Sequence, residues 1–281
     1  MYRFIRFPKG KAKAVTLSYD DGRKYDKQLA EIINRHNMKC TFNITTKCIG
    51  NEDSLSGEEI KELFNEGHEI AVHSFNHRAP GQTRPIEGIK DVLQCRSNLE
   101  SLLGAIVRGM AYPNSGITSM DSGDTYENIR GYLKNLDIVY ARTLGGDNDS
   151  FAIPTDWYAW MPTAHHNNPH IFEYIEKFVN FAPEKVYESG RQAKLFYIWG
   201  HSYEFAEDNN WDKLEKICSV LGGRDDIWYA TNIEIYEYVN AYHSLVFSAD
   251  EKMVYNPTIL TVWFENENGT HCVKSGETIK L

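Results

Sequence analysis

Short apolar runs alternate with longer amphipathic segments along most of the chain. The apolar runs are rich in β-branched and aromatic residues, which is typical of strands, and they lie at residues 14–22, 40–44, 69–72, 106–112, 138–141, 195–199 and 227–230. The segments between them carry apolar residues at helical spacing and predict helices at residues 24–37, 56–66, 126–135, 170–181, 211–221 and 232–242, with a further long helix that ends near residue 104.

This order of strands and helices determines the fold class that we expect. Strands that alternate with helices form mostly parallel sheets with the helices packed outside. About seven such units are present, close to the eight of a closed (β/α) barrel. We therefore expect an α/β fold, a distorted or incomplete (β/α) barrel of about seven strands. The stretch 144–169 shows no regular period and is expected to be irregular.

The last part of the chain follows another pattern. From residue 245 the helical period is lost, and β runs at 259–264 and 270–274 flank the polar segment 265–269, which is typical of a hairpin. We expect a barrel domain at 1–244 and a short C-terminal β extension at 245–281 that packs on the barrel, since it is too short to fold alone.

Composition excludes some classes of function. The chain has 281 residues, 42% of them hydrophobic and 25% charged, as in ordinary globular domains, and a net charge of −9 that argues against a nucleic acid partner. No apolar run is long enough for a membrane span. With no visible signal peptide and five scattered cysteines, we expect a cytoplasmic protein, although a secreted protein without its signal sequence would look the same. The oligomeric state stays open.

Two adjacent acids end the first strand. Val15, Leu17 and Tyr19 suit a buried strand, but Asp20 and Asp21 cannot continue it into a core, because burying unpaired carboxylates is costly. The acids must lie where the strand emerges, and in α/β folds that end carries the chemistry. The simpler alternative is an Asp-Asp-Gly turn without another role.

Three histidines follow other strands. His73 and His77 come after the run 69–72, one helical turn apart, and His201 comes after the run 195–199. Because the carboxyl ends of parallel strands share one rim, these groups can converge with the acids. Two histidines and one carboxylate form a metal-ligand set found in zinc hydrolases and, in a similar form, in non-haem iron oxygenases. Exposed or capping histidines are the alternative.

The chemistry of hydrolysis gives each group a possible role. A metal needs one ionised ligand, and a second carboxylate can take a proton from water. His201 titrates near neutrality and suits protonation of a leaving amine, unless it is a structural histidine. An arginine such as Arg108 beside the base would fix its ionisation, and Asp156 beside His201 would orient the imidazole ring. Ordinary surface charge is the alternative for both. Tyr112, Trp157 and Trp199 would wall the pocket, although core packing explains aromatic residues equally well.

Taken together, these motifs resemble the NodB-homology polysaccharide deacetylases, carbohydrate esterase family 4. The first motif of that family, T-F-D-D-G, corresponds to Ser18-Tyr19-Asp20-Asp21-Gly22, and the second, H-S/T-x-x-H, corresponds to His73-Ser74-Phe75-Asn76-His77. The resemblance implies that Asp20 is the general base and that Asp21, His73 and His77 bind a divalent metal, most often zinc.

The later motifs match less closely. His201 lies where the family has a leucine-x-histidine general acid, with Trp199 in place of the leucine, and Asp156-Trp157 matches the aspartate-tryptophan motif whose aspartate tunes that acid. The third motif departs from the pattern: the chain has Ala111-Tyr112-Pro113-Asn114-Ser115-Gly116, Asn114 replaces an aromatic residue, and Arg108 lies three residues upstream of the expected arginine. A backbone N–H in this segment is expected to help hold the oxyanion. The resemblance covers residues 11–242.

The resemblance implies a metal-dependent hydrolase that removes acetyl groups from N-acetylated sugars, a polysaccharide or oligosaccharide deacetylase with an acetylated carbohydrate as its partner. Hydrolysis of another C–N bond, in an amide or cyclic imide, or of O-acetyl esters remains an alternative. A catalytically inactive carbohydrate-binding protein is an alternative of another class, and an iron oxygenase fits least well. His165 and His166 have no role that the family implies.

Overall fold

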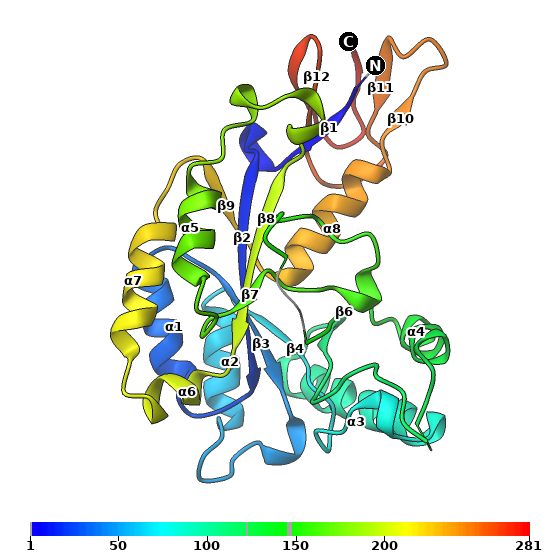
Figure 1. Ribbon diagram of the computed structural model, residues 1–281. Helices are drawn as coiled ribbons and strands as arrows, with labels where there is room; N and C mark the ends of the chain where they lie inside the picture. Colours follow the sequence, from blue (N-terminus) through cyan, green and yellow to red (C-terminus); the bar gives the residue numbers. More distant parts are fainter. Residues whose placement is uncertain (1, 122, 145–147) are drawn as a thin grey trace.

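The computed structural model (Figure 1) describes residues 2–121, 123–144 and 148–281. Its strands are β1 Phe4–Arg6, β2 Lys13–Asp21, β3 Cys40–Ile44, β4 Glu69–Val72, β5 Gly109–Ala111, β6 Tyr140–Arg142, β7 Ala164–His165, β8 Lys194–Gly200, β9 Ile227–Tyr229, β10 Val246–Phe247, β11 Met253–Tyr255, β12 Val262–Asn266, β13 Gly269–Val273 and β14 Thr278–Lys280. Its α-helices are α1 Asp26–Arg35, α2 Gly57–Asn65, α3 Pro85–Leu103, α4 Tyr126–Asn135, α5 Ile171–Val179, α6 Ser202–Glu207, α7 Trp211–Leu221 and α8 Asn232–His243.

The central sheet is parallel throughout. Within the described ranges it contains eight strands in the order β6-β5-β4-β3-β2-β8-β7, and β9 pairs with the first residues of β2. The strands curl, and the helices lie outside them (Figure 1). The expected distorted (β/α) barrel is therefore confirmed.

The stretch expected to be irregular brings the two ends of this sheet together. Residues 145–147 lie outside the described residues, but Trp160 pairs in parallel with Arg142 at the end of β6. A few residues later, the amides of Thr163 and His166 donate to the carbonyls of Tyr197 and Trp199 in β8 at 2.8 Å each. Trp160 and β7 thus form a short, interrupted strand that lies between β6 and β8. Its pairings are too few to leave a strand pattern in the sequence.

Strand β2 explains how the barrel is filled. Successive side chains of a strand point to opposite faces. Val15, Leu17 and Tyr19 pack outward into the core shared with the helices, while Ser18 and Asp20 take the opposite, inner face. Both faces are buried, and apolar Val15, Leu17 and Tyr19 alternate along the strand with polar Thr16, Ser18 and Asp20. The barrel interior is partly polar.

Helix α8 covers the amino-terminal end of the barrel. Its cap is formed by Thr231 and Glu234, which complete a capping box. The N–H of Ile233 donates to Oε2 of Glu69 at 2.9 Å, and Thr41 donates to the same oxygen at 2.9 Å. The Tyr140 hydroxyl donates to the other oxygen at 2.7 Å. Buried Glu69 thus ties the start of α8 to three strands.

The C-terminal residues form two small sheets, β1-β12-β13 and β10-β11-β14. The predicted hairpin is present as β12–β13, but it turns at residues 267–268, since Asn266 pairs with Gly269. The unexpected partner is the N-terminal strand β1, which pairs antiparallel with β12. Both termini therefore lie at the same end of the molecule (Figure 1). The boundary expected at 244/245 stays a prediction.

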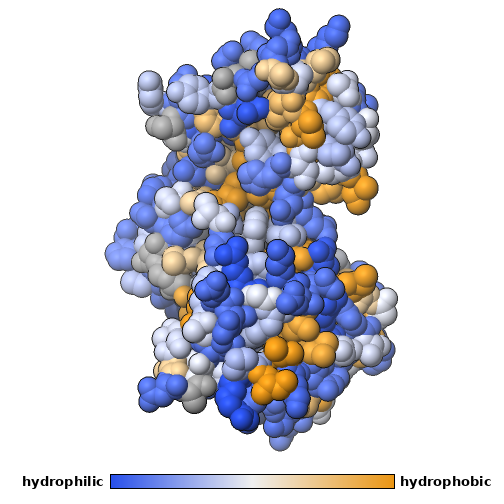
Figure 2. Space-filling view, turned by 90° about the vertical axis from the view of Figure 1, so that its right-hand side faces the viewer, coloured by the Kyte–Doolittle hydropathy of each residue, from blue (hydrophilic) through white to orange (hydrophobic). Residues whose placement is uncertain are grey.

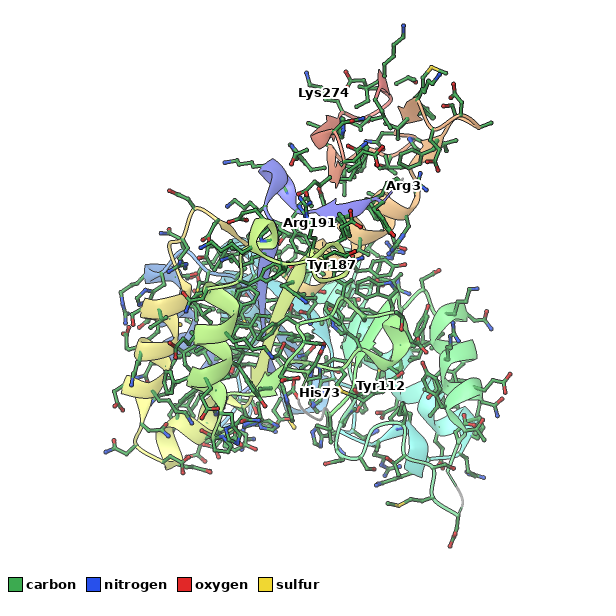
Figure 3. The ribbon with its side chains drawn as sticks, turned by 45° about the horizontal axis from the view of Figure 1, so that its top comes forward. Arg3, His73, Tyr112, Tyr187, Arg191 and Lys274 are labelled. Atoms are coloured by element: carbon green, nitrogen blue, oxygen red, sulfur yellow. The ribbon has the colours of Figure 1, made fainter. Side chains whose placement is uncertain are left out.

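A buried ion pair fastens this β region to the rest of the chain. Glu265 of β12 accepts from Nε of Arg6 at 2.9 Å and is also contacted by Arg191, which precedes β8. Figure 3 shows Arg191 and Tyr187 at this junction, at the far end of the barrel from His73.

The predicted helices are all present, with ends shifted by a few residues, and α6 is an addition that the sequence pattern did not predict. Among the described helices, none has both the length and the apolar character that crossing a bilayer requires. The face shown in Figure 2 is mainly hydrophilic, and its hydrophobic residues lie in separate groups.

Candidate active site

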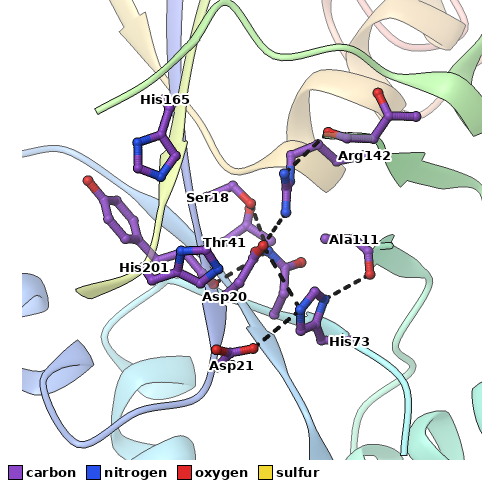
Figure 4. A network of polar contacts seen from close by, with 12 residues as sticks. Ser18, Asp20, Asp21, Thr41, His73, Ala111, Arg142, His165 and His201 are labelled. Atoms are coloured by element: carbon purple, nitrogen blue, oxygen red, sulfur yellow. Dashed lines mark hydrogen bonds and ion pairs between the residues drawn. The ribbon is translucent and has the colours of Figure 1, made fainter. Parts of the chain in front are cut away.

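Asp20 lies on the inner face of β2, close to its carboxyl end, and is 1% exposed. The β2–β3 register places Asn43 opposite, and its amide donates to Oδ1 of Asp20 at 2.9 Å. Arg142, at the end of β6, is fully buried and binds Oδ2 through its guanidinium (Figure 4). The guanidinium stacks over the ring of Trp199, with 4.4 Å between Cζ of Arg142 and the ring centroid. The guanidinium thus gives this buried carboxylate a positively charged partner.

Asp21 is the next residue and faces the two histidines of the loop after β4. Its Oδ1 lies 3.4 Å from Nε2 of His73 and 3.0 Å from Nε2 of His77. Burial alone would raise the pKa of Asp21, but the two histidines outweigh it and hold the pKa well below its usual range. Nδ1 of His73 lies 2.9 Å from the carbonyl oxygen of Ala111, to which it donates, so the lone pair of this imidazole is on Nε2 (Figure 4).

The backbone around this set is strained. Asp21, Ser74, His77 and Asn114 have φ values of 81°, 62°, 56° and 49°, in the left-handed region that non-glycine residues rarely adopt. Such conformations cost on the order of 1–3 kcal/mol each and collect at functional sites. The Asn114 amide donates to the His77 carbonyl at 3.1 Å and helps to hold the loop.

A small open cavity gives access to the set. It has a volume of about 170 Å³ and is lined by Asp21, Arg23, Thr45, Cys48 and His77. Asp21, His73 and His77 are one of the groups in the described residues whose ligand atoms lie close enough to share a metal ion. Their role as metal ligands stays a prediction.

His201 lies on the other side of Asp20, directly after β8 (Figure 4). Its Nδ1 is 3.4 Å from Oε2 of Glu204. The expected pairing of His201 with Asp156 is wrong, because Asp156 accepts from the hydroxyl of Tyr126 at 2.5 Å and from the amide of Tyr158 at 3.0 Å. Asp156 caps a 3₁₀ turn there.

The expected pairing of Arg108 with Asp20 is also wrong. Arg108 precedes β5, at the amino-terminal end of the barrel, where it is partly exposed and lies 4.0 Å from Glu237 of α8. Parallel strands place their first and last residues at opposite ends of the sheet, so a residue before β5 cannot reach the end of β2. Arg142 occupies the place that Arg108 was expected to fill.

Of the three aromatic residues expected to wall the pocket, one lies at the site and two lie in the core. Trp199 contacts Arg142 and the ring of His165 at the site. Tyr112 is fully buried and donates to the Tyr158 carbonyl at 2.9 Å, while Trp157 packs edge-to-face on Trp160 and Tyr236. Tyr112 and Trp157 are therefore packing residues and do not line the cavity.

Two site residues were missed, although the sequence carried a signal for each. Arg142 directly follows the predicted strand 138–141, the same strand-end position that singled out Asp20 and His201. Glu204 lies three residues after His201, at the spacing of a capping box.

Comparison with known families gives this geometry a context. The family described as polysaccharide deacetylase matches residues 8–137, which include Asp20, Asp21, His73 and His77. The amino-terminal half of the chain therefore resembles this family. The matched segment ends before Arg142, His201 and Glu204, so that part of the candidate site rests on the structure alone. No curated protein sequence gave a significant match.

Solved structures share the fold of this chain. A candidate polysaccharide deacetylase from Mycobacterium smegmatis is 15% identical over 85% of this chain and 94% of its own, with a TM-score of 0.59. The Xyl-CE4 domain of a multidomain xylanase from the hindgut metagenome of Trinervitermes trinervoides is 16% identical over 82% and 92%, with a TM-score of 0.53. A family 4 acetyl xylan esterase from Clostridium thermocellum, in complex with a cobalt ion, is 17% identical over 80% and 91%, with a TM-score of 0.51.

Proposed function

We propose that this protein is a divalent-metal-dependent hydrolase that removes acetyl groups from N-acetylated sugars. The observation that carries the proposal is the pair of adjacent carboxylates with separate surroundings. Asp21 faces two imidazole nitrogens, whereas Asp20 is enclosed by Arg142 and Asn43. The similarity of residues 8–137 to the polysaccharide deacetylase family supports hydrolysis of an acetyl group by such a site.

The residues at Asp21 fit a divalent cation. Its Oδ1 faces Nε2 of His73 and Nε2 of His77, and the hydrogen bond from Nδ1 of His73 to Ala111 leaves Nε2 of His73 free to coordinate. A carboxylate with two imidazoles is a ligand set for zinc, and the acetyl xylan esterase of similar fold was solved with cobalt. When bound, the cation would polarise the acetyl carbonyl and make water more acidic.

The remaining chemistry belongs to side chains of this chain. Asp20, paired with Arg142, takes the proton from the attacking water. Asn43 fixes the orientation of that carboxylate through Oδ1. His201 stands on the opposite side and gives a proton to the leaving amine. A base and an acid on the two sides of the reacting carbonyl avoid the need for one group to do both steps.

A larger hollow adjoins the loop that carries His77. It has a volume of about 530 Å³ and is lined by this loop and α3, with Ser74, Arg78 and Lys90 among its polar residues. This size lies in the range of small-molecule sites. We propose that a sugar of the substrate occupies this hollow while its acetamido group reaches the site.

Acetate release from purified protein tests the proposal. The substrates are N-acetylglucosamine oligomers, with acetylated xylan as the ester arm, each assayed with zinc and after chelator treatment. We expect zinc-dependent acetate from the N-acetylated oligomers, lost with chelator and restored by zinc. Release only from xylan would replace the amide by an ester substrate, and release that is indifferent to chelator would refute the metal dependence.

A further inference from the structure

A second polar cluster lies beside the site, at the carboxyl ends of β7 and β8. It consists of Glu204 and the three histidines His165, His166 and His201, here called the Glu204 cluster. One oxygen, Oε2 of Glu204, lies 3.2 Å from Nε2 of His165, 3.3 Å from Nε2 of His166 and 3.4 Å from Nδ1 of His201. The backbone N–H of His201 also donates to it at 3.1 Å.

The hydrogen bonds of His165 show whether the Glu204 cluster is a hydrogen-bond network or a second metal site. The amide of Asn167 donates to Nδ1 of His165 at 3.1 Å, so Nδ1 carries the lone pair of the neutral ring. The proton is then on Nε2, the atom that faces Glu204. A ring nitrogen that carries a proton cannot coordinate a cation, whereas it can donate to a carboxylate. His165, His201 and Glu204 are close enough to share a metal, but this tautomer opposes it.

His166 is fixed in place by the local packing. It is fully buried, and its ring stacks between Phe205, at 4.1 Å between centroids, and Tyr19, at 5.7 Å. Gly200 makes the room, since a Cβ at that position would lie 2.0 Å from Nδ1 of His166. Burial lowers the pKa of His166 far below its usual range, so the ring is neutral. It limits where the Glu204 carboxylate can move.

We propose that Glu204 is the positioning residue of His201: it holds the proton on Nδ1 and thereby presents Nε2 of the ring to the leaving group. This inference rests on the proposed function, in which His201 is the acid. Asp156, expected at this place, is bound to Tyr126. The carboxylate that orients His201 instead comes from α6, the helix that begins directly after it.

Electrostatics agree with this geometry. Burial raises the pKa of Glu204, but hydrogen bonds from His165 and His201 outweigh it and hold the pKa well below its usual range. Burial in turn lowers the pKa of His201, and the nearby carboxylates of Glu204, Asp20 and Asp21 outweigh it, so the pKa is raised. The ring is thus kept in its acid form more readily.

The test compares Glu204→Gln with Glu207→Gln, an exposed carboxamide change on the same helix. In zinc-loaded enzyme we expect Glu204→Gln to lower kcat by on the order of 10–100-fold with KM within about twofold, as for other groups that orient a reacting residue. Glu207→Gln should leave both values within about twofold. An unchanged kcat in Glu204→Gln would refute the positioning role.

Two further measurements keep the inference independent of activity. Ring ¹⁵N spectra of the zinc-loaded protein, with the His201 signals identified by their loss in His201→Gln, should show Nδ1–H in the wild type and loss of that preference in Glu204→Gln. The opposite tautomer in the wild type would refute the proposal. If no substrate releases acetate, the proposed function fails, but these spectra still decide on Glu204.

Metal content gives the second check. Wild type and Glu204→Gln should each bind one equivalent of zinc, because the residues at Asp21 are untouched. Two equivalents in the wild type and one in Glu204→Gln would make Glu204 a metal ligand and overturn the proposal.

Discussion

The two ends of the barrel each bury a carboxylate, and their partners differ in kind. Asp20, near the carboxyl ends of the strands, contacts the guanidinium of Arg142. Glu69, at the amino-terminal end, accepts hydrogen bonds from neutral donors: Tyr140, Thr41 and the amide of Ile233. Both side chains belong to the inner layer of the same sheet.

The difference supports our proposal that proton transfer takes place at the carboxyl end of the strands. Burial raises the pKa of Glu69 to about 7, and its neutral hydrogen-bond donors only partly oppose this. Helix α8 also closes that end, so Glu69 serves to hold the barrel together. At the other end Asp20 is paired with the guanidinium of Arg142, and the next residue, Asp21, lines an open cavity. Burial alone does not make a carboxylate catalytic; its partner and its access decide.

The largest effect is expected from Asp20→Asn. The amide keeps the size of the side chain but cannot take a proton, so kcat should fall by about 10²–10⁴-fold, the usual contribution of general base catalysis. Acetate release and zinc content measure the two parts of the site separately. We expect zinc to stay at one equivalent, and activity near the wild-type level would remove Asp20 from the role of base.

The next effect concerns the two arginines. Arg142→Met leaves Asp20 buried without its partner, which typically costs about 3–5 kcal/mol of stability, and kcat should fall by on the order of 10–100-fold. Arg108→Gln, at the opposite end, should change kcat by less than about twofold.

Arg142→Lys keeps the positive charge and serves as a control in case Arg142→Met does not fold. It should melt at a higher temperature than Arg142→Met and retain more activity. If Arg108→Gln lost activity and Arg142→Lys did not, the partner of Asp20 would be misassigned.

The smallest effect on activity is expected from Glu69→Gln, and its signature is in stability. The pKa of Glu69 is raised from 4.5 to about 7 in the folded state, so folding favours the protonated acid. The contribution of this group is fully present below about pH 4.5 and is lost as the pH rises through 7. Urea unfolding at pH 4.5, 6 and 7.5 should therefore show the wild type losing stability relative to Glu69→Gln as the pH rises. Parallel pH dependences would show that Glu69 is ionised throughout.

Much of the fold was predictable because each element carries its own local signal. The capping box of Ser56 and Glu59 places the start of α2, and both of its hydrogen bonds are present. Helix α5 buries Ile171, Ile175 and Phe178 on the face that its spacing predicted. The pairing of β1 with β12 joins residues about 260 positions apart, and no local pattern reports such a contact.

The partners of the site residues were not predictable in the same way. Arg108 lies closer than Arg142 to the third motif, but sequence distance says nothing about which end of a strand a residue occupies. Asp156 matched a family motif, yet the 3₁₀ turn that it caps directs it to Tyr126. Glu204 is adjacent to His201 only because the chain turns into α6 at that point.

By itself, the sequence determined the order of strands and helices, the parallel barrel, and the strand-end position of Asp20, Asp21, His73 and His201. These follow from local periodicity and from the cost of burying charge in a strand. Only the tertiary structure decided that Asp20 turns inward to Arg142 while Asp21 meets the two histidines, and that His201 meets Glu204. The alternation along β2 assigns Asp20 to the polar inner face, but closure of the barrel decides which side chains from distant strands meet it there.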